Sequence, residues 1–129
     1  MSWKKELSQI KLREKLAKQQ GGSEAVKVQH DKGRLTLRER IDLLLDKDSF
    51  DEIGKVAGGA EYDDEGNLLS LTPANFILGF GKIEGQDVIV GGEDFTVKGG
   101  SPNAAGLRKS VYTEAVSYTH LRAHETPAN

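Results

Sequence analysis

Two glycine pairs, Gly91–Gly92 and Gly99–Gly100, constrain the backbone more than any other feature of this chain. An apolar, β-branched run leads into the first pair, the segment Asp94–Thr96 lies between the pairs, and Ser-Pro-Asn after the second pair can open a helix. Glycines in such pairs indicate backbone that passes close to another strand or to a ligand, because they leave the space of a side chain empty. The stretch therefore predicts a strand that leads through tightly packed turns into a helix.

Composition excludes several classes of protein. The chain has 129 residues, a net charge of -2 and no cysteine, which excludes disulfides and thiolate metal sites and gives no general attraction to nucleic acid. No run approaches the roughly 20 apolar residues that a membrane span needs. We expect a cytoplasmic protein with neither nucleic acid nor membrane as partner. An aromatic content of 6% is thin for an independent core and indicates a piece of something larger.

Residues 1–46 predict a helical arm. Lys4–Gln20 is typical of a charged helix with an incomplete apolar stripe, and Ser23 can cap a second helix that runs to Asp31. The clearest signal is a capping box, in which Thr36 is the N-cap and Glu39 follows three residues later.

Residues 47–116 predict short strands followed by a helix. The segment 62–68 indicates a polar hairpin loop, and Phe76–Ile83 and Gln86–Val90 form a strand pair around the turn Glu84–Gly85. Both strands are strongly apolar, as in a sheet that is covered on both faces. The helix Asn103–Val116 carries an apolar stripe, made of Leu107, Val111 and Ala115.

Residues 117–129 differ in character from the rest. They resemble a translated sequencing-adaptor remnant, so we expect a non-native tail and exclude it from the fold. His120 and His124 have a helical spacing that suits zinc, but the motif lacks the glutamate of H-E-x-x-H, and we expect no metal.

Three blocks, His30–Asp46, Ser49–Gly54 and Asp94–Ser101, resemble in order and spacing the carboxyltransferase (β) subunit of biotin-dependent acyl-CoA carboxylases. The hairpin Ile77–Gly85 is similar to that family's strand pair. The resemblance runs from Met1 to about Ala115. It implies an α/β fold, namely the N-terminal part of a crotonase-like superhelix of β-β-α turns, preceded by the helical arm.

The resemblance also implies an enzyme. In that family a carboxyl group moves from carboxybiotin, held on a biotin carrier protein, to acetyl-CoA or propionyl-CoA. Biotin carboxylase, the carrier and further copies of the subunit are the implied partners. Backbone N–H groups at helix N-termini stabilise the thioester enolate, and they belong to motifs that follow the region seen here. We therefore assign no catalytic residue and expect this fragment to be inactive.

Gly99, Gly100 and Ser101 are the candidate cofactor-binding residues, because backbone N–H groups ahead of a helix can hold a phosphate or coenzyme A. Alternatively, these glycines let one turn of the superhelix pass close under the next. Arg108 and Lys109 either contact coenzyme A phosphates or belong to a helix face that meets solvent or a subunit.

Other patterns favour ordinary roles. We interpret His30 as a structural or surface histidine, and Asp94 with Thr96 as a turn cap in preference to an acid pair with Glu93. The Gly79-Phe80-Gly81 spacing to Gly85 lies across a hairpin, which excludes a dinucleotide site. An ion-paired helix surface is expected from the interleaved charges of Asp31, Lys32, Arg34, Arg38, Glu39, Arg40 and Asp42.

Two other functions stay open. One is a biotin-dependent acyl-CoA decarboxylase subunit of the same superfamily, and nothing in this stretch separates it from a carboxylase. The other is a small, non-catalytic α+β interaction module, which the lack of a nucleophile–base pair or metal cluster in the sequence supports.

Thermal denaturation of the purified 129-residue chain separates a fragment from a module. A fragment is expected to aggregate or to remain partly disordered, since its apolar strand pair lacks a covering layer. A cooperative melt of a monodisperse species would support the module instead. Carboxylation of an acyl-CoA by this chain alone would contradict the expected inactivity.

Overall fold

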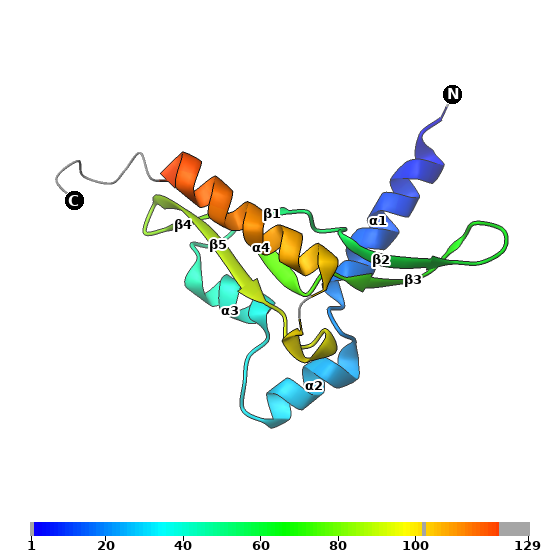
Figure 1. Cartoon of the computed structure of the whole chain (residues 1–129), viewed down its shortest axis with the longest axis horizontal. Coiled ribbons are helices and arrows are strands. Elements are labelled where there is room, and N and C mark those ends of the chain that lie inside the picture. Colours follow the sequence, from blue (N-terminus) through cyan, green and yellow to red (C-terminus); the bar gives the residue numbers. More distant parts are fainter. Residues whose placement is uncertain (1, 102, 122–129) are drawn as a thin grey trace.

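The computed structural model describes residues 2–101 and 103–121. Within these residues three helices precede five strands, and a fourth α-helix follows them (Figure 1). The elements are α1 (Lys4–Lys18), α2 (Ser23–Asp31), α3 (Leu37–Leu44), β1 (Asp51–Ile53), β2 (Gly58–Tyr62), β3 (Leu68–Pro73), β4 (Phe76–Ile83), β5 (Gln86–Glu93), a 3₁₀ turn (Lys98–Gly100), α4 (Ala104–Val116) and a final π-helical turn (Ser117–Leu121). Among the described helices, none has the length and apolarity that crossing a bilayer requires.

The central sheet has three antiparallel strands in the order β1-β4-β5. Its hairpin is closed at Glu84 and Gly85, which both have positive φ, as in the two-residue turns that match strand twist. This strand pair was predicted, but β5 ends at Glu93 and not at Val90. Gly91 and Gly92 stay in the strand because the side chains of Phe76 and Leu37 fill the space beside them.

Helices cover this sheet on both faces, as the apolar strands predicted. The buried side chains of Ile41 from α3 and of Leu45, which directly follows α3, meet Ile77 of β4 on one face. On the other face α4 crosses β4 and β5 (Figure 1), with Thr113 beside Gly91. Burying aliphatic side chains at about 1.5–3 kcal/mol each is the main stabilising contribution available to so small a core.

The capping box at the start of α3 is confirmed. The Thr36 hydroxyl accepts a hydrogen bond from the Glu39 N–H at 3.3 Å and donates to the Glu39 carboxylate at 3.1 Å. The predicted cap of α2 is wrong. Ser23 is already the first helical residue, and Gly22 precedes it with φ 98°, a conformation that favours glycine and leaves no side chain to cap.

The arm is fixed to the body through the C-terminal half of α1 and the segment that follows it. Arg13 donates to the Tyr62 hydroxyl of β2, and Lys55 pairs with Glu14 at 3.1 Å. Figure 1 shows α1 and the two-stranded sheet β2-β3 extending to the same side of the molecule. Beyond the C-terminal end of α1, the Gly21 N–H donates to the Thr96 hydroxyl at 2.9 Å. This bond joins the arm to the turn that follows β5.

The helix after the glycine pairs is confirmed, with Asn103 as its N-cap, but its buried face is not the predicted one. Leu107 and Val111 of the expected stripe are 59% and 61% exposed. The face toward the sheet is formed instead by Gly106, Lys109 and Val116. Gly106 allows this orientation, because a Cβ atom there would lie 2.1 Å from the Asn75 Oδ1 atom.

The close approach of Gly21 to Thr96 gives a direct test. A Cβ atom at Gly21 would lie 1.6 Å from the Thr96 carbonyl oxygen, so Gly21→Ala is expected to lower the free energy of unfolding by about 1–3 kcal/mol, as overpacking does. Gly59→Ala is the matched control, since no atom lies within 4 Å of that added Cβ. Urea denaturation measures both. Equal stability of the two variants would contradict the steric account.

Candidate functional site

The turn after β5 is held by a buried carboxylate. Asp94 is 2% exposed, and its Oδ1 atom accepts hydrogen bonds from the Thr96 N–H at 2.9 Å and the Thr96 hydroxyl at 2.6 Å. The Asp94 N–H donates to the Asn75 carbonyl at 2.8 Å. The turn-capping interpretation of Asp94 and Thr96 is therefore confirmed, and the turn is fixed to the residue that precedes β4.

The candidate residues Gly99, Gly100 and Ser101 follow this turn directly. Lys98, Gly99 and Gly100 have φ of 49°, 62° and 81°, a run of left-handed conformations that is strained for the lysine. A side chain at Gly100 would contact the Phe95 ring at 2.7 Å, so close packing accounts for this glycine. The Ser101 carbonyl accepts a hydrogen bond from the Asn75 side chain.

Backbone hydrogen bonds within the turn bear on its use as an anion site. The Gly100 N–H donates to the Val97 carbonyl at 3.0 Å, and the Ser101 N–H donates to the Lys98 carbonyl at 3.1 Å. In this conformation neither N–H is directed at a ligand. The binding role of Gly99, Gly100 and Ser101 stays a prediction, and basic side chains beside the turn are the alternative source of anion contacts.

Such side chains border a hollow of about 560 Å³ between β2 and the start of α4. Lys98 and Arg108 both line it, together with the first residues of α4. The Asn103 side chain caps that helix by accepting from the Gly106 N–H at 2.7 Å. Glu61 also lines the hollow, but two cations and the N-terminus of α4 outweigh its single negative charge and suit the hollow to an anionic group.

Lys109, next to Arg108, lies in a different environment from the predicted one. It is only 9% exposed, and its Nζ atom donates to the Phe76 carbonyl at 3.2 Å. The prediction that this residue lies on a face toward solvent or a subunit is wrong for this structure. The cause is the orientation of α4 about its axis, in which Gly106 and Lys109 face the sheet.

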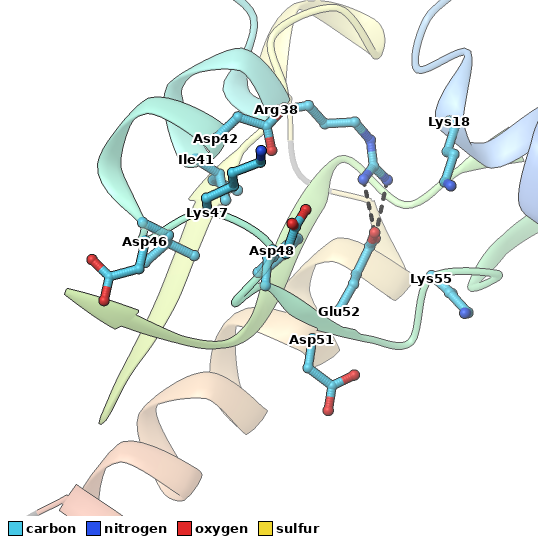
Figure 2. Close-up of a pocket in the computed structure, with 12 residues that line it drawn as sticks. Lys18, Arg38, Ile41, Asp42, Asp46, Lys47, Asp48, Asp51, Glu52 and Lys55 are labelled. Carbon is cyan, nitrogen blue, oxygen red and sulfur yellow. Dashed lines mark hydrogen bonds and ion pairs between the residues drawn. The ribbon is translucent and has the colours of Figure 1, made fainter. Parts of the chain in front are cut away.

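The charges of Glu52 and Arg38, which form a half-buried ion pair, both act on the buried Lys109. Arg38 of α3 holds the Glu52 carboxylate of β1 in a bidentate pair, at 2.7 and 3.0 Å (Figure 2). Burial lowers the pKa of Lys109, because it penalises the charged ammonium; Glu52 opposes this shift and Arg38 reinforces it. The Lys109 stem passes 3.0 Å from the position of a Cβ at Gly54, which has φ 66° and leaves room for it.

Arg38 and Glu52 also line a broad hollow of about 770 Å³ between α3 and β1. Figure 2 shows the Arg38–Glu52 pair in this hollow, with Lys18 and Lys55 beyond it. Asp46 on its rim accepts from the N–H groups of Glu84 and Gly85 at 2.9 and 2.8 Å, which fixes the hairpin turn. The charges here therefore serve mainly to join α3 to the sheet.

The ion-paired helix surface is confirmed in part. His30 is a half-exposed residue whose Nε2 lies 2.6 Å from Glu39 Oε1, as expected for a surface histidine. This contact is the largest cause of the lowered pKa of Glu39. Lys27 pairs with Asp31 at 2.6 Å. The predicted pairing does not include Arg38, whose partner is Glu52 on β1 and not a neighbour on its own helix.

Two remaining predictions concern glycines and histidines. Gly79 and Gly81 lie within β4 of a hairpin, where Cβ atoms would meet Asp51 and Leu45, so the rejection of a dinucleotide site is consistent with the fold. Among the residues that the structure describes, no group of three His, Asp or Glu side chains could hold a metal. His124 and most of the predicted non-native tail lie outside the described residues.

Comparison with known proteins identifies the family. The family model described as the carboxyl transferase domain matches residues 28–126. The chain belongs to the carboxyl transferase domain family. The propionyl-CoA carboxylase beta chain of Roseobacter denitrificans is 38% identical over 105 residues, which cover 80% of this chain and 20% of that protein. The biotin-dependent 3-methylcrotonyl-coenzyme A carboxylase beta1 subunit of Mycobacterium tuberculosis is 36% identical over 103 residues, 78% of this chain and 18% of that protein.

Solved structures agree with this membership of the carboxyl transferase family. The transcarboxylase 12S structure matches with a TM-score of 0.75 and 30% identity, over 92% of this chain and 24% of that chain. The beta subunit of P. aeruginosa geranyl-CoA carboxylase matches with a TM-score of 0.58 and 29% identity, over 88% of this chain and 19% of that chain. The predicted crotonase-like α/β fold is confirmed. The chain spans about a fifth of the length of the curated relatives it matches.

The grouping of Lys109 with Arg38 and Glu52 is the part of this carboxyl transferase segment that sequence analysis missed. Arg38 and Glu52 lie in two of the blocks that carry the resemblance, but the sequence pattern favours ion pairs with nearby residues for Arg38. A signal for Lys109 was available, because Gly106, Lys109 and Thr113 share one helix face and Gly106 can mark a close approach. The apolar stripe with Leu107 and Val111 predicts the opposite face as the buried one, which leaves Lys109 toward solvent.

The pKa of Lys109 can be measured from the ¹³Cε resonance of the labelled chain. This resonance is expected to titrate below the ordinary lysine value of 10.5, because burial penalises the ammonium. Stability should then rise with pH between the lowered pKa and the unfolded value, since the unfolded state binds more protons there. Glu52→Gln should lower the Lys109 pKa further. A Lys109 resonance that titrates with the exposed lysines would contradict this burial.

Proposed function

We propose that this chain is part of a biotin-dependent acyl-CoA carboxyltransferase, which transfers a carboxyl group from carboxybiotin to acetyl-CoA or propionyl-CoA. The observation that carries the proposal is the family match over residues 28–126, to which the structural likeness to transcarboxylase 12S adds. That protein is described with methylmalonyl-coenzyme A bound. The match counts against the alternative of a small non-catalytic module.

The partners are proposed from the same relatives. Biotin would arrive on a biotin carrier protein after carboxylation by a biotin carboxylase, and the complete subunit would form a homo-oligomer in the cytoplasm. A relative of Mycobacterium tuberculosis is named a biotin-dependent acetyl-/propionyl-coenzyme A carboxylase beta5 subunit, 43% identical over 82 residues. The transcarboxylase 12S is described as a hexamer assembly.

Within this chain, the residues that fit acyl-CoA lie around Gly99–Ser101. Lys98 and Arg108 line the hollow beside this turn, and their charges suit the phosphates of coenzyme A. We propose that the turn and these two side chains meet that end of the substrate. When bound, carboxybiotin supplies the carboxyl group, and we assign none of the described residues to hold it.

The chain alone is proposed to be inactive and to belong to a longer protein. Leu107, Val111 and Tyr112 leave α4 with an exposed apolar face, which a further β-β-α turn would cover. Residues 1–46 would then be the arm and residues 47–116 the first strands and helix of the domain. The oxyanion-forming turns would follow in the rest of the subunit.

The test is to read the source locus past Ala115, express the complete reading frame and measure biotin-dependent carboxylation. We expect incorporation of labelled bicarbonate into acetyl-CoA or propionyl-CoA only when biotin carboxylase and the biotin carrier are present. The 129-residue chain in the same assay is the control and should give none.

Three other results would overturn parts of this proposal. Carboxyl loss from methylmalonyl-CoA or malonyl-CoA to biotin, without the forward reaction, would identify the decarboxylase. An inactive complete subunit would reject the transfer reaction. Activity of the short chain would reject its inactivity.

A further inference from the structure

Lys109 is a buried cation to which the proposed reaction gives no role. Its ammonium can donate three hydrogen bonds, yet it faces only the Phe76 carbonyl at 3.2 Å and the charge of Glu52. Both Glu52 oxygens are already held by Arg38. A buried charge is costly, and an apolar residue of similar volume would often be as stable or more stable. The benefit of this buried charge therefore lies in how it positions its neighbours and not in added stability.

That geometry connects four elements of the fold. Arg38 belongs to α3, Glu52 to β1, the Phe76 carbonyl to β4 and Lys109 to α4. The contact at Phe76 lies at the first residue of β4, where the strand begins to pair with β5. Lys109 therefore fixes α4 against the sheet at the end of β4 that faces the turn after β5.

Asn75 carries this constraint to the candidate turn. It directly precedes Phe76, is 2% exposed and donates from its side chain to the Ser101 carbonyl. Its own carbonyl accepts from the Asp94 N–H at 2.8 Å. Gly106, one helical turn before Lys109, packs against the Asn75 amide oxygen. Displacing α4 or Phe76 thus displaces the amide that holds Ser101.

We infer that Lys109 is a positioning residue for the turn Gly99–Ser101, acting through the Phe76 carbonyl and the Asn75 side chain. The inference rests on the proposed function for the claim that this turn meets acyl-CoA. Lys109→Met would keep a side chain of similar length but would remove the hydrogen-bond donor to the Phe76 carbonyl.

Hydrogen–deuterium exchange on the complete subunit tests the positioning. Lys109→Met should raise exchange in the segment 98–107 at least about tenfold, as expected from losing a hydrogen bond with a charged donor. Lys82→Met is the matched control, because Lys82 forms an exposed pair with Asp87 and should leave that segment unchanged. Unchanged exchange in Lys109→Met, or an even increase over the whole protein, would overturn the inference.

Steady-state kinetics give a second readout. We expect Lys109→Met to raise KM for the acyl-CoA several-fold more than it lowers kcat, because the turn is misplaced while the downstream reactive groups stay intact. Glu52→Gln keeps the size of the side chain and is the second variant if Lys109→Met does not fold. It should also raise exchange in the segment 98–107 and KM for the acyl-CoA. A fall in kcat with KM unchanged would contradict positioning of the substrate turn.

The two proposals fail separately. If the wild-type complete subunit does not carboxylate acyl-CoA, the proposed function is rejected, and exchange in segment 98–107 still decides whether Lys109 holds the turn. If the wild type is active and Lys109→Met matches it in KM and in exchange, the role of Lys109 is rejected alone.

Discussion

The buried contact of Lys109 with the Phe76 carbonyl, beside the Arg38–Glu52 pair, is the constraint on which the arrangement of elements depends. An ammonium group loses much of its hydration in this position, so its neighbours must compensate with charge and a carbonyl oxygen. These neighbours come from α3, β1 and β4, which are far apart in sequence. Lys109 thus joins α4 to β4, and Arg38 joins α3 to β1.

These contacts give a physical account of why two separate blocks of sequence resemble one family together. The first block supplies Arg38, and the second supplies Glu52 and Gly54, whose missing side chain leaves room for Lys109. A third block contains Asp94, which caps its own turn and is held to Asn75. Because Asn75 precedes Phe76, the third block is held beside the beginning of β4.

Local signals predicted much of the fold, and distant contacts decided the rest. The Thr36 box and the hairpin turn at Glu84 depend on residues within a few positions, so the sequence alone was sufficient for them. The face of α4 depends on which side meets Asn75 and Glu52, and apolarity favoured the wrong side, with Leu107. The candidate turn at Gly99 was found from its glycines, but its internal hydrogen bonds became visible only in three dimensions.

The bond between Gly21 and Thr96 has a consequence for the order of events during synthesis. Its two partners are 75 positions apart, so the segment after α1 cannot form this bond until the strand pair and its following turn have left the ribosome. Until then α1 and α2 are short, highly charged segments with little intrinsic helical stability. The turn between α1 and α2 therefore gains its final contacts only after residues much later in the sequence have been made.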